Sequence, residues 1–387
     1  RLCCSFSEKT ILGSTGHVAS KSDISRVIVT PMNAALQRIL IVKPSSLGDV
    51  VHTLPLAHAI KRTYPSCYIG WIVQQNFRAI LDHDPAVDEV IPISIPSTSD
   101  PQAPRGAWLA AAKATYKTIR RLRSEFKRAP YDVVLDLHAS FRSGLLALTN
   151  PGGVRFGFSD AKELNTRFQH ELIVPKPDRP HAVDKNLAFS ERLGCSALPE
   201  DFRVFSSESA REKVRRFLVQ AGKTKPTRLV YANPAARWET KFWTVDGWTK
   251  LADLLIEETG AVVVFSGSPA DVPYIESIRE RMKNQPLIAA GKLSLSEAVA
   301  LVEASDVYVG VDSGPMHIAA FTDTKVVAIF GPTDPAKVGP YGSGHVVLSA
   351  SWLECLSCRK RSCNHPRCME ELTAETVFQE TVRLMGW

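Results

Sequence analysis

Asp49 is a carboxylate at a predicted strand–loop–helix joint, with Lys43 nearby. It follows the apolar run Ile39–Val42, which predicts a buried strand that ends at Pro44. Beyond Gly48, apolar residues recur at helical spacing, at Val50, Leu54, Ala57 and Ile60. A carboxylate at such a strand–loop–helix joint lies where open α/β sheets bind ligands, and it can accept a proton from a reacting hydroxyl. The alternative is that Asp49 only caps the helix.

A second group of polar residues follows another predicted strand, Val307–Val311. Asp312, Ser313 and Gly314 form the turn into a helix, and His317 lies one turn further on. Backbone N–H groups at a helix start suit a diphosphate, and glycine lets a phosphate approach the backbone closely. The same residues also fit an ordinary turn, with Asp312 and Ser313 as caps and His317 at the surface.

Lys241 supplies a positive charge after the first predicted strand of the second half of the chain. It directly precedes Phe242 and Trp243. A lysine ammonium is a suitable point charge for phosphate groups. A solvated lysine beside core tryptophans is an equally good interpretation of these residues taken alone.

The elements that would hold these residues alternate between strand and helix in two successive series. The first series has predicted strands at 39–42, 67–73, 89–93, 131–137 and 154–158, and helices that begin at 48, 76, 107 and 182. The second has strands at 229–231, 261–266, 287–289, 307–311 and 326–330, helices at 246–258, 269–283, 294–304 and 314–321, and a final amphipathic helix at 370–385. Two such series predict an α/β protein with two doubly wound parallel sheets.

Domain boundaries follow from this alternation. Residues 38–203 would form the first domain and residues 204–387 the second, with the linker at 195–208. Residues 1–37 lack strong periodicity and also lack the basic and long apolar regions of a signal peptide. We therefore expect them to be a disordered or non-native extension, with Met32 as a candidate start, and we expect a cytoplasmic protein.

Composition and missing motifs exclude several classes of protein. The 387 residues are 44% hydrophobic and carry a formal net charge of +7, too diffuse a basic excess to argue for nucleic acid. No apolar run approaches the ~18 residues of a membrane span. There is no Gly-x-Gly-x-x-Gly after the first strand, no P-loop and no Gly-x-Ser-x-Gly elbow, which weighs against a dinucleotide oxidoreductase, a P-loop nucleotidase and an α/β-hydrolase.

Four cysteines crowd the end of the chain, at Cys355, Cys358, Cys363 and Cys368, with His365 among them. The first pair has good spacing for a zinc site, but the later gaps are short and irregular. Reduced thiols or local disulfides are the alternatives. We expect no metal site.

The segment Lys43–Pro55 resembles the opening motif of glycosyltransferase family 9, the bacterial ADP-heptose:lipopolysaccharide heptosyltransferases, and is closest to the heptosyltransferase I type. Further matches include the Asp312-Ser313-Gly314 turn with His317, the segment Asn233–Trp243, and Gly291–Leu295. The resemblance covers about residues 38 to 387. One departure is the pair Ala235 and Ala236, where the heptosyltransferase I pattern has two threonines.

The resemblance implies the GT-B architecture, in which two Rossmann-like domains with parallel sheets face each other across a cleft, and a C-terminal helix often returns to the first domain. It implies an inverting, metal-independent transfer of heptose from ADP-heptose to the lipopolysaccharide inner core, a Kdo-lipid A type acceptor, without a cofactor. Asp49 would be the catalytic base. The donor-binding residues would be Lys241, Leu293, Asp312, Ser313, Gly314 and His317, and the acceptor-binding residues would be Lys43, Ser46 and Arg142.

Other functions remain open at this point. A nucleotide-sugar epimerase shares the GT-B architecture and needs no acceptor, and another nucleotide-sugar transferase would use the same fold. A non-catalytic nucleotide-binding or zinc-tail protein is a third alternative. We expect a monomer that meets its acceptor at the inner face of the membrane as a peripheral protein, without a nucleic-acid partner.

Overall fold

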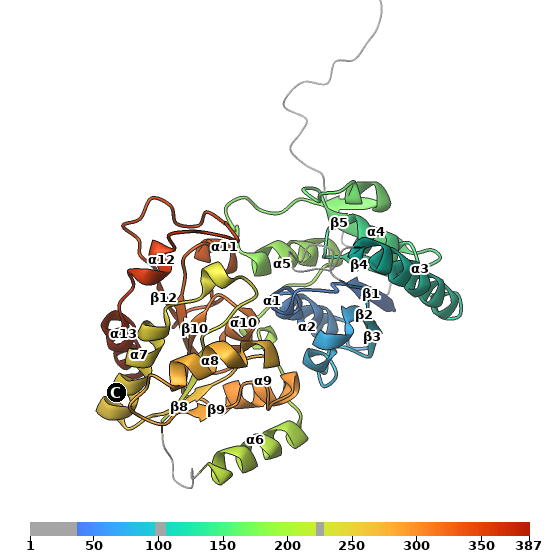
Figure 1. Cartoon of the computed structure of the whole chain (residues 1–387). Helices are drawn as coiled ribbons and strands as arrows, with labels where there is room; N and C mark the ends of the chain where they lie inside the picture. The colour runs from blue at the N-terminus through green and yellow to red at the C-terminus, as the bar shows by residue number, and fades with distance from the viewer. Residues whose placement is uncertain (1–36, 97–105, 222–227) are drawn as a thin grey trace, which may run out of the picture.

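A computed structural model describes residues 37–96, 106–221 and 228–387, and it contains two six-stranded parallel sheets, each with helices packed against it (Figure 1). The predicted extension at residues 1–37, with Met32, lies outside the described residues except for its last position. The α/β prediction with two doubly wound sheets is confirmed.

The first sheet has the strand order β3-β2-β1-β4-β5-β6. Its strands are β1 (Arg38–Val42), β2 (Tyr68–Gln74), β3 (Glu89–Ile93), β4 (Val133–Asp136), β5 (Val154–Phe158) and β6 (Glu171–Ile173). The central strand β1 is completely buried from Ile39 to Val42 because helices cover both faces of a doubly wound sheet. The carboxyl end of β1 therefore leads into the loop before α1 (Leu47–Val51), the helix that carries Asp49.

The second sheet repeats this order around its own first strand, as β12-β11-β10-β7-β8-β9. Its strands are β7 (Leu229–Asn233), β8 (Val262–Phe265), β9 (Leu287–Ile288), β10 (Val307–Val311), β11 (Lys325–Ile329) and β12 (Val346–Leu348). The neighbours β7 and β10 end beside each other, so Asn233 and Asp312 reach the same edge of the sheet.

The helices connect successive strands. The first half contains α1 (Leu47–Val51), α2 (Leu54–Thr63), α3 (Ala107–Phe126), α4 (Phe141–Ala147) and α5 (Ala182–Leu193). The second contains α6 (Glu208–Gln220), α7 (Val245–Thr259), α8 (Val272–Arg279), α9 (Leu295–Glu303), α10 (Gly314–Ala320), α11 (Pro335–Val338), α12 (Arg367–Glu370) and α13 (Ala374–Met385).

Two local predictions are wrong. The single helix expected beyond Gly48 is two helices, α1 and α2, because Pro55 in the first turn of α2 has no N–H to continue the ladder. The final helix α13 does not return to the first domain. It packs on α7 and β11 within the second half, where Val377 is buried.

The two halves meet where α1 packs on α10. Gly48 is buried at this contact, and a Cβ atom there would lie 2.4 Å from Cδ2 of His317. Only a residue without a side chain allows the two helices to approach this closely. The contact places Asp49, next to Gly48, beside the start of α10.

We predict that Gly48→Ala lowers the free energy of unfolding by about 1–3 kcal/mol, because the added methyl overpacks a buried ring. Alanine favours a helix over glycine by up to about 1 kcal/mol. Gly48→Ala should therefore leave the free energy of unfolding unchanged or raise it when the ring of His317 has been removed. Thermal or urea unfolding of Gly48→Ala, His317→Ala and the double variant measures this coupling. An equal effect of Gly48→Ala in both backgrounds would contradict the proposed contact.

Candidate functional site

The carboxylate of Asp49 is held by the loop that precedes its helix. Its Oδ2 accepts hydrogen bonds from the backbone N–H of Ser46 (2.9 Å) and from the hydroxyl of Ser46 (2.8 Å). Its Oδ1 lies 3.7 Å from Nζ of Lys43, and the side chain remains 43% exposed. Asp49 thus caps α1 while part of its carboxylate stays exposed, so the two interpretations of the sequence are compatible.

Lys43 is buried behind this carboxylate. Its ammonium donates a hydrogen bond to the carbonyl oxygen of Leu137 at the end of β4, at 2.6 Å, and faces Asp49. Desolvation raises the pKa of the Asp49 carboxyl, but the charge of Lys43 and the hydrogen bonds from Ser46 outweigh it, so this pKa lies well below its usual range. Asp49 is therefore an anion throughout the neutral pH range.

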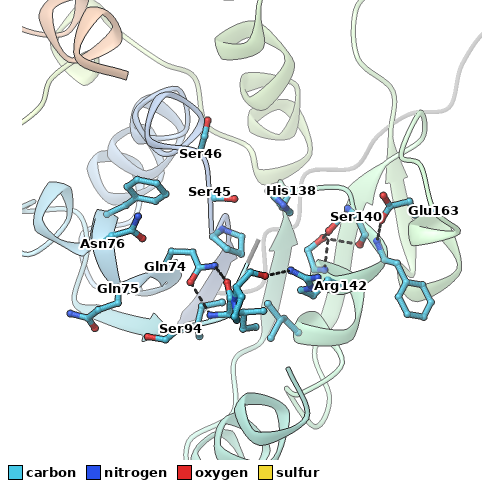
Figure 2. A pocket seen from close by; sticks show the side chains of 18 of the residues that line it. Ser45, Ser46, Gln74, Gln75, Asn76, Ser94, His138, Ser140, Arg142 and Glu163 are labelled. Atoms are coloured by element: carbon cyan, nitrogen blue, oxygen red, sulfur yellow. Dashed lines mark hydrogen bonds between the residues drawn. The ribbon is translucent and has the colours of Figure 1, made fainter. Parts of the chain in front are cut away.

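A cavity of about 960 Å³ opens beside this loop. Figure 2 shows Ser45, Ser46 and the segment Gln74–Asn76 on one side of it, with His138, Ser140, Arg142 and Glu163 on the other. The lining comes from the carboxyl edge of the first sheet, from the start of α4 and, through Arg237, from the second half of the chain. The cavity therefore lies where open α/β sheets bind ligands.

The three predicted acceptor residues occupy different places. Ser46 and Arg142 line the cavity, and Arg142 also donates to the carbonyl oxygen of Pro96 at 3.4 Å. Lys43 is not part of the lining, because its ammonium is directed toward Asp49 and Leu137. The geometry thus brings Lys43 to the predicted base and leaves two of the three side chains for a cavity ligand.

The predicted donor residues gather at the carboxyl edge of the second sheet. Lys241 makes a 2.7 Å ion pair with Asp312, and its ammonium lies 4.9 Å from the ring centroid of Trp238. The hydroxyl of Ser313, the N-cap residue of α10, accepts a hydrogen bond from Asn233 at 3.1 Å and makes no cap bond to the helix. Polar groups of β7, β10 and α10 therefore converge at this edge.

Leu293 lies apart from this cluster, in the loop between β9 and α9, where it is partly buried against the core. At the end of β7, the side-chain amide of Asn233 donates to the carbonyl oxygen of Ala235 at 2.7 Å. The backbone turn at Ala235 is thus fixed by Asn233 without a side-chain hydroxyl at that position.

Three buried histidines lie between the two halves. Nε2 of His52, at the end of α1, is 2.9 Å from Nδ1 of His317 on α10, and the rings of His52 and His181 are 5.5 Å apart. Nε2 of His181 donates to the carbonyl oxygen of Gly339, at 3.1 Å, in the second half. Desolvation lowers the pKa of all three, that of His317 to about 4, so the cluster is neutral at neutral pH.

No functional role was predicted from the sequence for His52, His181, His138 or Arg237. His52 stands inside the opening motif, three residues after Asp49, and this position was a usable signal. His138 follows β4 directly, so it had to reach the same edge as Asp49 once β4 was placed beside β1. The positions of His181 and Arg237 depend on how the two halves pack and had no local signal.

The cysteine-rich tail contains free thiols. Cys355, Cys358 and Cys363 are exposed, while Cys368 is buried against Gly331. Within residues 37–96, 106–221 and 228–387, no group of three or more His, Cys, Asp or Glu side chains is arranged to hold a metal ion.

Two doubly wound halves, each built on a six-stranded parallel sheet, form the GT-B class of fold. Residues 119–368, well over half of the chain, match the family described as glycosyltransferase family 9 (heptosyltransferase). The chain belongs to this family, and it is a glycosyltransferase.

Individual relatives agree with this assignment. Lipopolysaccharide heptosyltransferase 1 of Pseudomonas aeruginosa is 28% identical over 331 residues, which cover 85% of this chain and 88% of that protein. The E. coli heptosyltransferase WaaC, solved with ADP, is 25% identical with a TM-score of 0.67 and covers 90% of this chain and 100% of its own. A family 9 glycosyltransferase from Veillonella parvula, at 22% identity and a TM-score of 0.76 over 91% and 98% of the two chains, confirms the fold.

None of the helices in the described parts of the chain has both the length and the apolar composition needed to cross a bilayer. The longest helix, α3, has 20 residues and carries several cations.

We predict that the free energy of unfolding falls as the pH is lowered from about 6.5 toward 4. In this range the unfolded chain binds protons that His52 and His317 cannot bind in the fold, and each histidine adds up to about 1.4 kcal/mol per pH unit to the slope. His52→Asn should therefore make the free energy of unfolding depend less steeply on pH in this range, as measured by urea denaturation at several pH values.

His58 provides a contrast. Burial lowers its pKa, but the hydrogen bond and charge of Asp84 outweigh this, so the pKa is raised. The contribution of His58 to the free energy of unfolding is complete below pH 6.5, its pKa in the unfolded chain. It is lost as the pH rises through the higher pKa of His58 in the fold. His58→Gln should thus change the slope above 6.5 and leave the acidic range as in the parent. For His52, the free energy of unfolding should depend on pH less steeply in His52→Asn than in the parent. Equal slopes in the acidic range would contradict the lowered pKa assigned to His52.

Proposed function

We propose that this protein transfers heptose from ADP-heptose to a hydroxyl of the lipopolysaccharide inner core, in a single inverting displacement. The observation that carries this proposal is the position of Asp49. Its half-exposed carboxylate lies beside the cavity of the first sheet, on a helix packed against α10. The family membership and the printed functions of the relatives support the same reaction.

In the proposed step the acceptor oxygen forms a bond to the anomeric carbon of the heptose while the bond from that carbon to the donor phosphate breaks. The acceptor proton moves to Asp49, and ADP leaves with the electron pair of the broken bond. Attack from the face opposite to the leaving group inverts the anomeric centre. Asp49 is the only residue assigned to proton transfer.

Lys43 supports this role through Asp49. Its buried ammonium stabilises the carboxylate as an anion and fixes it with the help of Ser46. The lowered pKa makes Asp49 a weak base before the acceptor arrives. We infer that proton transfer accompanies bond formation, because the hydroxyl becomes far more acidic as its oxygen attaches to carbon.

The donor diphosphate is assigned to the edge of the second sheet. Lys241 and the backbone N–H groups at Ser313 and Gly314 would neutralise the charge that grows on ADP as it leaves. Lys241 is paired with Asp312 in this structure, so a bound diphosphate would share or replace that partner. With a lysine in this role, the reaction is proposed to proceed without a metal ion.

The cavity of the first sheet is assigned to the acceptor. Its two arginines, Arg142 and Arg237, suit the carboxylates of a Kdo-type sugar, and Ser46 and Gln75 provide neutral hydrogen-bonding groups. A volume of about 960 Å³ is at the upper end of small-molecule sites, as expected for a sugar acceptor larger than one ring.

We predict that Asp49→Asn lowers the turnover number by roughly 10²–10⁴-fold, the usual contribution of a positioned base. Asparagine keeps the shape of the side chain, so the affinity for ADP should change little. Initial rates with ADP-heptose and a Kdo-lipid acceptor measure the first effect, and calorimetric titration of ADP measures the second. Near-normal turnover of Asp49→Asn would exclude Asp49 as the base.

We also predict that ADP binds more tightly than UDP or GDP, and that Lys241→Ala weakens all three alike. Lys241 contacts the part that the three nucleotides share, and charge-assisted hydrogen bonds are about twice as strong as neutral ones. Base selectivity would arise elsewhere, near Leu293 and the ends of the strands. Calorimetric titration of the three nucleotides against parent and variant tests both statements.

Lys337→Ala is a suitable control, because this exposed lysine pairs with Asp334 on α11 in the same half. It should bind all three nucleotides as the parent does. Tighter binding of UDP or GDP than of ADP would replace the heptosyl donor with a different nucleotide-sugar.

A further inference from the structure

Most of the net positive charge of the protein is concentrated in α3 and its C-terminal end. Residues 107–128 carry seven Lys or Arg residues and one acidic residue, Glu125, which gives a formal charge of +6 against +7 for the whole chain. The charge that was diffuse by composition is therefore local in the structure. A single helix accounts for nearly all of the excess.

The same helix exposes large apolar side chains near its beginning. Trp108, Leu109 and Tyr116 are 65%, 57% and 64% exposed, respectively. Three large apolar residues exposed within nine positions form a local patch, which is less common than single exposed residues on a soluble surface. The guanidinium of Arg120 lies 5.9 Å from the ring centroid of Tyr116, and Lys113 stands between Leu109 and Tyr116, so apolar and cationic side chains are interleaved along the helix.

Leu109 and Tyr116 share one face of the helix with several cations, whereas Trp108 is exposed in the first turn, about 100° around the helix axis from Leu109. The stripe Leu109, Lys113, Tyr116, Arg120 and Lys127 follows helical spacing and lies opposite the buried stripe of Ala111, Thr118, Leu122 and Phe126. The 20 residues span about 30 Å at 1.5 Å per residue. The outward stripe, which we term the α3 face, thus combines cations along its length with apolar side chains in its N-terminal half.

The α3 face is next to the cavity of the first sheet. Figure 1 shows α3 alongside α4, and the two helices are in contact. Phe141 and Arg142, in the first turn of α4, line the cavity, and Ile93 at the end of the strand before α3 lines it too. The apolar side chains of the α3 face lie toward the N-terminal end of α3, which belongs to this same carboxyl edge of the sheet.

We propose that the α3 face docks on the surface of an anionic lipid bilayer. Trp and Tyr side chains favour the interface between hydrocarbon and water, and each Lys or Arg near an anionic surface strengthens binding. The helix would lie on the surface without spanning it. The purpose of this docking, to bring a lipid-borne acceptor to the cavity, rests on the proposed function, while the docking itself does not.

A lipid surface fits the α3 face better than the two other occupants of comparable size. A nucleic acid would use the cations but would leave exposed Leu109 and Trp108 without a role. A second copy of this chain would bring the cations of two α3 faces together, and like charges across an interface oppose association. An anionic surface with an apolar interior matches both kinds of side chain on the stripe.

The test is co-sedimentation of the full chain with vesicles made of equal parts of phosphatidylglycerol and phosphatidylcholine, and with vesicles of phosphatidylcholine alone. We expect binding to the anionic vesicles, and we expect it to weaken at higher salt. Lys113→Gln with Arg120→Gln should weaken it about thirtyfold, since each basic residue contributes about a factor of five. Trp108→Ser with Leu109→Ser should weaken it at least about tenfold, because both side chains lose apolar surface that would be buried.

The matched control is Arg215→Gln with Arg216→Gln, which removes two exposed cations from α6 and should leave vesicle binding unchanged. All variants should bind ADP like the parent, which shows that they are folded. The vesicles contain neither donor nor acceptor, so loss of transfer activity with intact docking would overturn only the proposed function. Equal binding to both kinds of vesicle, equal effects of the α3 and α6 variants, or a dimer that dissociates on Leu109→Ser would overturn the docking proposal.

Discussion

The close contact between α1 and α10 is the constraint on which the rest of the site depends. Each sheet is wound and buried independently, so nothing within one half fixes the position of the other. The contact forms because Gly48 has no side chain to meet His317, and the hydrogen bond between His52 and His317 then fixes its register. Through it, the carboxylate of Asp49 in the first half lies beside the helix that follows Asp312 in the second half, as the proposed site requires.

The buried ammonium of Lys43 imposes a second constraint. A buried charge requires a partner, and Lys43 has the carbonyl oxygen of Leu137 and the carboxylate of Asp49. Asp49 is therefore needed for the local structure as well as for the proposed chemistry. This double role explains why a shape-preserving change at Asp49 is more informative than a truncation, which would leave a buried cation with only a carbonyl oxygen beside it.

Most long elements with clear periodicity could be predicted from the sequence, although α6, which directly follows the predicted linker, was missed. Elements defined by tertiary contacts could not be predicted. The bounds of α3, β5, α5 and β10 agree with the structure because their apolar spacing is regular. Short elements such as α4 and β12 had too few residues for a period. In the site, Lys241 and Asp312 were both expected near the donor from the family resemblance, whereas the contact of His52 with a residue 265 positions away had no local signal.

The chemistry of the interface also bears on how a ligand could enter. Neutral imidazoles and a backbone carbonyl hold the two halves together near the site, and no ion pair between described residues of α1 and α10 joins them there. Each such hydrogen bond contributes only about 0.5–1.5 kcal/mol net, because water replaces it when it breaks. Buried apolar residues of both halves, such as Val51 and Met316, also belong to one hydrophobic cluster. The burial of apolar surface therefore holds the halves together more than these hydrogen bonds do, and a ligand that enters between them has to offset it. The low pKa values of the histidines suit this contact as well, because a protonated cluster would place like charges together where the halves meet.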